Sequence, residues 1–377
     1  MVERPNVFEN MLSKDPSLIL RRLTLRQRSV LRLVVKGHVE SAGPIGSSWL
    51  KKRYNLAMSP ATIRNEMSEL ETLGLLSHPF TSAGRIPTKL GYQAFVSELM
   101  ETAVISNEEQ LLMQREMLAA MQDTQALIRE SSKLLSRLAR LLGVVLSPQI
   151  NNGVLERLEI VQISSETVMF VISVKGGFIR TILMQVAVEL RRSQLDALVA
   201  LLNERLAGLK LDEIRRTCVP RFQDLTEEET GIIRLVVNRS AELFSETPES
   251  RMVQLDGTPH ILAQPEFSES APMRELIELL DDGTSMVKLI ERDVNGDSNQ
   301  TETFYGSNGQ ASIRIGIELG HFSSGKLSIV TAPYTRSNLQ GVIGLIGPTR
   351  MNYARAVALV EGMSTLMSAP SSPEHFA

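Results

Sequence analysis

The pattern of apolar and polar positions is clearest between residues 59 and 74, where it predicts an amphipathic helix. Ser59 stands at the expected N-cap, and Pro60 takes the first helical position, where a missing N–H costs nothing. Gly74 supplies the stop. Three apolar residues recur at helical spacing and form one face of this helix: Ile63, Met67 and Leu70.

The opposite face of the helix carries small and polar residues. Small side chains allow a close approach to a DNA groove, and Arg64 and Asn65 are the types that pair with guanine and adenine edges. An ordinary surface helix with a good cap would show the same amphipathic pattern. The candidate DNA-reading residues are Ser59, Ala61, Thr62, Arg64, Asn65 and Ser68.

The segments that precede this helix favour the DNA-binding interpretation. Residues 24–39 predict a first helix, in which Thr24 and Gln27 have the spacing of a capping box. Residues 43–47 turn the chain into a short second helix, and residues 55–58 form a tight turn. This is the order of a helix-turn-helix, in which the last helix reads the DNA.

The segment after the helix predicts a wing. Residues 75–87 are too few for another domain, and they fit two short strands with a tip at residues 81–85. Cations and hydroxyls suit phosphate contacts, which position a protein on DNA without reading its sequence. The candidate phosphate contacts are Thr81, Ser82, Arg85 and Lys89.

Charge is unevenly distributed along the 377 residues. The whole chain has 40 Lys and Arg against 43 Asp and Glu, a net charge of −3. Residues 1–100 hold 14 basic and 8 acidic residues, a net of +6, and the remainder holds 26 and 35, a net of −9. A basic head on an acidic body is typical of a protein that binds a polyanion. An asymmetry of this size also arises by chance, so it supports the motif and does not replace it.

Several longer motifs occur along the chain. Residues 43–47 are Gly-Pro-Ile-Gly-Ser, residues 59–67 are Ser-Pro-Ala-Thr-Ile-Arg-Asn-Glu-Met, and residues 81–88 are Thr-Ser-Ala-Gly-Arg-Ile-Pro-Thr. These stretches resemble the N-terminal domain of the heat-inducible transcription repressor family, HrcA. Residues 341–353, Gly-Val-Ile-Gly-Leu-Ile-Gly-Pro-Thr-Arg-Met-Asn-Tyr, extend the resemblance toward residue 367. Phe80 departs from the family pattern, because a His is expected there.

The resemblance implies a repressor of chaperone operons. Such a repressor binds double-stranded DNA as a homodimer, at an inverted-repeat operator known as CIRCE. The resemblance also implies that the chaperonin keeps the repressor competent to bind. It implies a body with a GAF-like domain that is interrupted by an inserted dimerising module.

The pattern beyond residue 100 changes from helix to strand and back. Residues 108–142 predict a long helix with an apolar seam, packed either on its own body or on a second subunit. Strands follow at 158–163, 168–174 and 178–186, helices at 189–206 and 225–244, further strands at 312–318, 326–331 and 342–346, and a last helix at 351–367. This alternation favours an α+β domain with an insertion.

We therefore expect an α+β multidomain chain. Its expected parts are a flexible extension (1–20), a winged helix-turn-helix domain (21–100), a first GAF-like part (105–189), an inserted dimerising module (190–256), a second GAF-like part (257–367) and a flexible tail (368–377). The start of the chain lacks the apolar region of a signal peptide, and no apolar run approaches the ~18 residues of a membrane span. The single Cys218 fits a reducing compartment, so we expect a cytoplasmic protein.

The sequence shows no catalytic constellation. The five His residues have no metal-ligand spacing, and no Gly-Lys-Ser/Thr phosphate loop is present. Residues 341–348 are glycine-rich, but their alternation with Val, Ile and Leu predicts a packed strand, and Arg350 is expected to form a structural ion pair. We expect no cofactor, no metal and no enzyme activity.

Three classes of function are weighed. The first is a DNA-binding repressor, and the second is a metabolite-responsive winged-helix regulator with the GAF-like body as ligand sensor. The third is an enzyme with a nucleic-acid-binding head, against which the missing catalytic residues argue. A thermal-shift screen with small effectors would separate the second class from the first.

Overall fold

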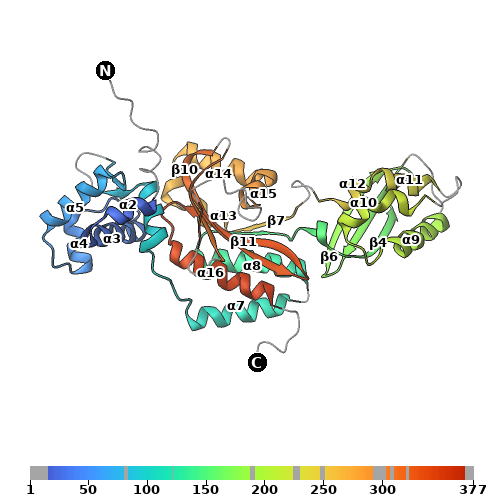
Figure 1. Ribbon diagram of the computed structural model, residues 1–377, viewed down its shortest axis with the longest axis horizontal. Helices are drawn as coiled ribbons and strands as arrows, with labels where there is room; N and C mark the ends of the chain where they lie inside the picture. The colour runs from blue at the N-terminus through green and yellow to red at the C-terminus, as the bar shows by residue number, and fades with distance from the viewer. Residues whose placement is uncertain are drawn as a thin grey trace, which may run out of the picture.

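The computed structural model describes residues 16–79, 84–121, 123–186, 192–223, 230–246, 251–291, 303–305, 310–319 and 322–369. Their elements form three parts that lie in a row (Figure 1). We call the described residues up to 99 the head, residues 150–246 the insert, and the remainder the body. The body lies between the head and the insert (Figure 1).

The head combines helices with a two-stranded ribbon. Its elements are α2 (Pro16–Arg22), α3 (Leu25–Ser41), α4 (Ser47–Tyr54), α5 (Pro60–Thr72), β1 (Leu76–Ser77), β2 (Ile86–Pro87), α6 (Lys89–Ala94) and the π-helix η1 (Phe95–Leu99). The predicted caps are confirmed, because Thr24 and Gln27 form a capping box and Ser59 accepts a hydrogen bond from the Thr62 N–H. Gly74 has a φ of 74° and follows the end of α5, as predicted.

The body is built on one antiparallel six-stranded sheet. Its strands are β3 (Leu142–Leu146), β7 (Val253–Asp256), β8 (Thr303–Tyr305), β9 (Ser312–Leu319), β10 (Phe322–Arg336) and β11 (Leu339–Pro348). Their order across the sheet is β7-β3-β11-β10-β9-β8. The glycine-rich stretch 341–348 lies within β11, where it pairs with β10 and β3, so the predicted structural role is confirmed.

Helices cover both faces of this sheet. Val145, Ile343 and Leu345 point into one core, which they share with α7 (Asn107–Ala120), α8 (Thr124–Ala139) and α16 (Tyr353–Ser368). Val144, Leu146 and other alternate residues form a second core on the opposite face. That core is completed by α13 (Thr258–Leu262), the 3₁₀ turn Pro265–Phe267, α14 (Ser270–Asp281) and α15 (Gly283–Glu291). The α+β class is therefore confirmed.

The long helix expected over 108–142 is instead two helices. α7 ends at Ala120, and Asp123 caps the start of α8 by accepting a hydrogen bond from the Gln125 N–H at 2.9 Å. Residues after 141 belong to β3. The apolar seam of residues 108–142 is buried. Helix α7 folds back onto α8 (Figure 1), so the packing partner is the same chain and not a second subunit.

The insert has its own sheet and its own core. Its sheet has the order β4-β5-β6, with β4 (Leu155–Gln162), β5 (Thr167–Val174) and β6 (Phe178–Gln185) all antiparallel. A 3₁₀ turn at Ile150–Asn152 precedes β4, and β6 is followed by α9 (Arg192–Leu206), α10 (Leu211–Arg221), α11 (Thr230–Asn238) and α12 (Ser240–Phe244). The sequence did not predict α10, and residues 225–229 of the expected helix 225–244 lie outside the described residues.

The expected boundary of the insertion near residue 190 is wrong. The strands between 155 and 185 were expected to belong to the body, but they pair only with one another. The chain leaves the body sheet after Leu146 and returns to the neighbouring strand at Val253. Strands rich in Val and Ile show the same local pattern in either sheet, so their pairing partner could not be inferred from that pattern.

Two chain segments connect the insert to the body. The outgoing segment and the returning segment are joined where Ser147 N–H donates to the Met252 carbonyl at 2.9 Å. Further along, Glu246 N–H donates to Asn151 Oδ1 at 2.7 Å, and Ile150 N–H donates to the Glu246 carboxylate at 3.0 Å. These hydrogen bonds join the two segments on either side of residues 247–250, which lie outside the described residues.

Candidate nucleic-acid interface

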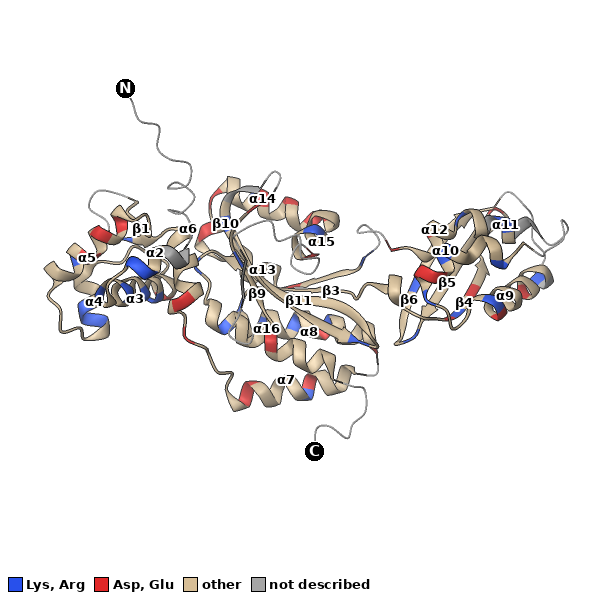
Figure 2. Cartoon of the chain, in the orientation of Figure 1, with Lys and Arg blue, Asp and Glu red and all other residues tan. Residues whose placement is uncertain are grey.

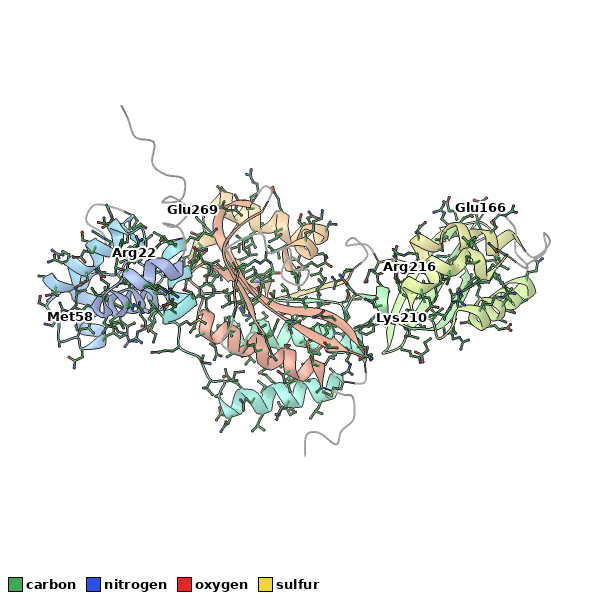
Figure 3. The ribbon with its side chains drawn as sticks, in the orientation of Figure 1. Arg22, Met58, Glu166, Lys210, Arg216 and Glu269 are labelled. Carbon is green, nitrogen blue, oxygen red and sulfur yellow. The ribbon has the colours of Figure 1, made fainter. Side chains whose placement is uncertain are left out.

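Helix α5 begins at the end of the head that lies furthest from the body. Met58, which directly precedes the Ser59 cap, lies at this outer end (Figure 3). Ile63, Met67 and Leu70 are buried in the head core, as predicted. Their burial turns the opposite face of α5 outward, and its exposed residues are Ala61, Arg64, Asn65 and Ser68. The structure therefore brings these four predicted residues together on one accessible face.

Ser59 and Thr62 are engaged with each other. The Thr62 N–H donates to Ser59 Oγ at 3.1 Å, and the two hydroxyl oxygens lie 2.8 Å apart. Ser59 is exposed, but its hydroxyl already caps the helix. These two residues therefore fix the start of α5, and any contact that they make to DNA competes with the cap.

Arg64 is the cation best placed on this face. It is exposed, and it has no ion-pair partner among the described residues. Asn65 is exposed beside it. A free guanidinium and a free amide in the first two turns of a helix suit contacts to base edges.

The ribbon after α5 is narrow and is held on one side by the loop before α4. Leu76 pairs with Pro87 and Ser77 pairs with Ile86. Arg85 directly precedes the second strand, and its main chain exchanges two hydrogen bonds of 2.8 Å with the main chain of Ile45. Gly84 is needed for this approach, because a Cβ there would collide with the Ile45 carbonyl. Two other predicted phosphate contacts, Thr81 and Ser82, lie outside the described residues.

Arg85 does not point freely to solvent. Its Nε lies 2.7 Å from Glu71 Oε2, and the His78 ring nitrogen Nδ1 contacts the other oxygen of the same carboxylate. Partial burial acts to raise the pKa of Glu71, but the His78 hydrogen bond and the Arg85 charge outweigh it and lower that pKa below its usual value. The Arg85 side chain is 24% exposed. Glu71 therefore neutralises the predicted phosphate contact in the free protein.

Lys89 faces the body. It is the first residue of α6, and its side-chain carbons lie over Gly316 of β9, so that a Cβ on Gly316 would be 3.0 Å from Lys89 Cδ. The structure thus places this predicted phosphate contact at the junction between head and body. The sequence could not indicate this, because the neighbour of Lys89 is more than 200 residues away.

Two lysines of α4 were missed by the sequence reasoning. Lys51 and Lys52 are exposed in the last turn of α4 and have no ion-pair partner among the described residues. Figure 2 shows the basic colouring of α4. In a helix-turn-helix the helix before the reader crosses the DNA backbone, where lysines contact phosphates. The basic run at 51–53 was the available signal. Its third member, Arg53, pairs with Glu40 at 3.1 Å.

The comparisons with known proteins now decide the family. The model of the HrcA protein C-terminal domain matches residues 125–357. The heat-inducible transcription repressor HrcA of Chlorobium limicola is 39% identical over 355 residues, which cover 92% of this chain and 97% of that protein. Its namesake from Chlorobaculum tepidum is 37% identical, with the same coverage. This chain belongs to the HrcA family.

A solved structure supports the fold. The crystal structure of a hypothetical protein aligns with a TM-score of 0.54 and 22% identity, and the alignment covers 92% of this chain and 98% of the other. At that identity the likeness concerns the fold alone. The HrcA relatives are named as transcription repressors, a class of protein distinct from enzymes.

In this HrcA chain the basic stripe of α3 is neutralised by the junction. Lys36 and Arg32 lie 2.7 Å and 2.8 Å from the two oxygens of Glu101, and Arg28 lies 3.8 Å from Glu98. The hydrogen bond and charge of Lys36, with the charge of Arg32, lower the pKa of Glu101. Arg32 and Lys36 therefore tie the head to the segment that leads into the body, while Arg28 pairs within the head. These pairs leave fewer cations for DNA than their number suggests.

A polar cluster lies in the junction between head and body. The Tyr92 hydroxyl and His38 Nδ1 lie 2.6 Å apart, and the Tyr92 ring packs at 6.1 Å from that of Tyr353 in α16. Burial, and then the charge of Arg350, lower the pKa of His38 to about 4. Burial raises the pKa of Tyr92 well above its usual value, so a protonated Tyr92 hydroxyl faces a neutral His38 ring, and the tautomer of that ring sets which of the two groups donates. Beside this cluster is a cavity of about 310 Å³, lined in part by Val35, Phe95, Met100 and Tyr353.

Two further side chains, Arg350 and Cys218, have structural surroundings. Arg350 pairs with Glu266 at 2.5 Å, which confirms its predicted role. Cys218 is buried in the insert, and burial raises its pKa to about 11. No group of His, Cys, Asp and Glu in the described part of the chain could hold a metal ion. Among the described helices, none has both the length and the apolar character required to cross a membrane.

Proposed function

We propose that this chain is a transcription repressor of heat-shock chaperone operons. It binds an inverted-repeat operator, the CIRCE element of its family, as a homodimer. The observation that carries the proposal is the exposed polar face of α5, with Arg64 and Asn65 in the first two turns of the helix. The names of its HrcA relatives, heat-inducible transcription repressors, support the same conclusion.

The head acts as a winged helix-turn-helix in this proposal. The order α3, α4, α5 and then the β1–β2 ribbon supports it. Helix α5 enters the major groove with its N-terminal turns, where Arg64 and Asn65 meet base edges. Lys51 and Lys52 contact phosphates on the flanking backbone. Ala61 and Ser68 are small enough to let the helix lie deep in the groove.

The dimer forms through the insert in this proposal. Helices α9 and α10 bury their apolar residues, such as Leu198, Leu202 and Ile214, against one face of the insert's sheet. The other face of the sheet has no described helix over it and exposes apolar side chains. Its most exposed apolar residues are Val161 at 41%, Ile179 at 58% and Leu183 at 64%.

Strand register joins these residues into one surface. Val161 of β4 lies opposite Met169 of β5, which lies opposite Leu183 of β6. Ile179 lies on the same face of β6, four residues before Leu183 and opposite Ser173. Residues directly opposite in antiparallel strands share a face. We call Val161, Met169, Val171, Ile179 and Leu183 the open sheet face, and the polar residues Arg157, Glu159, Ser173 and Thr181 lie on the same side of the sheet. Exposed apolar surface is typical of a protein–protein interface, and a second copy of this face is its occupant.

The chaperonin maintains the repressor in this proposal, as the family resemblance implies. A partner that favours the folded state raises its population by mass action. After heat shock, unfolded proteins occupy the chaperonin, so less active repressor remains and chaperone genes are released. The body, with its six-stranded sheet between two helical layers, supports the GAF-like assignment and holds the head in place.

Footprinting of the full-length protein on the chaperone promoters of its own genome tests the proposal. We expect protection of both arms of an inverted repeat, and a larger protected fraction with added chaperonin at an unchanged footprint. If none of the chaperone promoters is protected, the proposed operator is wrong. If the protected fraction stays constant across a chaperonin titration, only the proposed role of the chaperonin is wrong.

A further inference from the structure

The contact between α5 and the ribbon uses one carboxylate for both arms. Glu71 lies in the last turn of α5. One of its oxygens contacts His78, which follows β1, and the other lies 2.7 Å from Arg85, which precedes β2. The pairs 76–87 and 77–86 make positions 78 and 85 the next opposed pair of the ribbon. Glu71 therefore binds the ribbon symmetrically, at the point where its two arms leave the paired strands.

The surroundings of the carboxylate make this contact an anchor and not a loose surface pair. The side chains of Glu71 and Arg85 are 23% and 24% exposed. The Arg85 main chain is held separately by its two hydrogen bonds to Ile45. The base of the ribbon is thus fixed to the loop before α4 through its main chain and to α5 through Glu71.

A carboxylate beside a DNA-binding surface is unfavourable on charge alone. Glu71 both repels phosphates and neutralises Arg85, so it lowers affinity for any DNA unless it does something else. The geometry supplies that other role, because Glu71 sets the angle between the ribbon and the helix that reads the groove. We propose that Glu71 is a positioning residue, which orients the wing for operator binding through His78 and Arg85. This inference rests on the proposed DNA-binding function.

The proposal predicts an effect opposite in sign to that of simple charge removal. Glu71→Gln keeps the size of the side chain, but the amide has no charge and only one acceptor oxygen, so it cannot hold both His78 and Arg85. We expect operator affinity of the full-length protein to fall about tenfold, while affinity for scrambled DNA stays equal or rises. Glu66→Gln is the matched control on the same helix, because Glu66 has no ion-pair partner among the described residues. Its loss of charge should leave the operator-to-scrambled ratio unchanged.

The experiment measures binding to both DNAs by fluorescence anisotropy at several salt concentrations. It includes Arg85→Gln and the double variant Glu71→Gln with Arg85→Gln. If Glu71 and Arg85 act as one unit, the double variant should lose no more operator affinity than the single variant that binds the operator more weakly. Equal or higher operator affinity for Glu71→Gln would overturn the proposal, since Glu71 would then only mask Arg85.

A measurement without DNA separates this inference from the proposed function. Amide hydrogen exchange at residues 76–78 and 85–87 should become faster in Glu71→Gln and remain unchanged in Glu66→Gln. If the wild-type protein does not distinguish operator from scrambled DNA, the proposed function fails, and exchange alone decides whether Glu71 anchors the ribbon. Unchanged exchange in Glu71→Gln would overturn the anchor even in a protein that binds its operator.

Discussion

At the scale of single residues, pairing matters more than the number of charges. The head is basic by composition, but several of its cations already have carboxylate partners: Arg28, Arg32, Lys36, Arg53 and Arg85. Arg64, Lys51 and Lys52 have none among the described residues. Surface ion pairs are weak, yet each still has to be broken or shared before its cation contacts DNA. The free cations therefore mark the interface more sharply than net charge does.

The reader helix and α4 should fail in different ways when mutated. Arg64→Ala or Asn65→Ala should cost about 1–3 kcal/mol of operator binding and relax the preference at particular base pairs. Lys52→Ala should weaken binding to operator and scrambled DNA alike and lower the salt slope by about one. Titrations of both DNAs at several salt concentrations distinguish the two outcomes. An unchanged operator-to-scrambled ratio for Arg64→Ala and Asn65→Ala would mean that α5 is not the reader.

His38 should make the stability of the head depend on pH. The pKa of His38 is about 4 in the folded protein, whereas the ordinary value of a histidine without interactions is 6.5. Between these two pH values the unfolded chain therefore binds more protons than the folded protein. The stabilisation is complete above about pH 6.5 and is lost as the pH falls toward 4. His38→Gln removes this titration, and its melting temperature should therefore fall less between pH 7 and pH 5.

The single Trp49 lies in α4 and reports unfolding of the head by its fluorescence. Melting curves followed at this residue compare the wild type with His38→Gln. Parallel pH profiles for the two proteins would show that His38 is not the group responsible. Tyr92 is the natural second site to vary, since its hydroxyl is hydrogen-bonded to Nδ1 of His38.

At the scale of elements, local signals were predictable and packing partners were not. The capping box at Thr24, the cap at Ser59 and the stop at Gly74 depend on neighbours within four residues, and all three are confirmed. The break between α7 and α8 and the separate sheet of the insert depend on contacts across the chain, and both were predicted wrongly. The same holds for Arg85 and Lys89, whose residue type suits DNA but whose neighbours come from elsewhere.

The amphipathic helices of the insert illustrate the difference for function. Their apolar stripes suggest a dimer interface in the sequence, but the structure places them against the insert's own sheet. The surface left for a partner is the open sheet face. Side chains alternate between the two faces along β4, β5 and β6, so this face can be recognised only when the pairing of the three strands is known.

A charge on the open sheet face should disrupt the dimer. Leu183→Glu would bury an unpaired carboxylate in an apolar interface, which costs about 3 kcal/mol or more. That cost corresponds to a dimer weakened by about a hundredfold or more. Sedimentation of the full-length protein measures the change. Leu111→Glu is the control, because Leu111 is 66% exposed on α7 in the body. Dimers of equal strength in both variants would place the interface elsewhere.

At the scale of the whole molecule, the head and body share one continuous core. Residues of the head, such as Leu31 and Tyr92, belong to the same buried cluster as Met113 and Tyr353 of the body. The ion pairs of Glu101 and the contact of Lys89 with β9 reinforce the same junction. The head is therefore held in a defined orientation, and the start of α5, next to Met58, lies at the end of the head away from the body (Figure 3). Variants of the full-length chain test function better than an isolated head, which would expose part of this core.

The connection between body and insert through two chain segments has a consequence for operators. A single connecting segment would swivel freely, whereas two segments that are hydrogen-bonded at Ser147 and Met252 resist torsion. In a dimer joined at the inserts, the two reading heads then keep a fixed rotational phase along the DNA. Lengthening the operator spacer by about five base pairs, half a helical turn, moves one half-site to the far side of the duplex. Gel-shift titration should show loss of most two-site binding for that operator. Equal binding would mean that the arms twist to follow the groove.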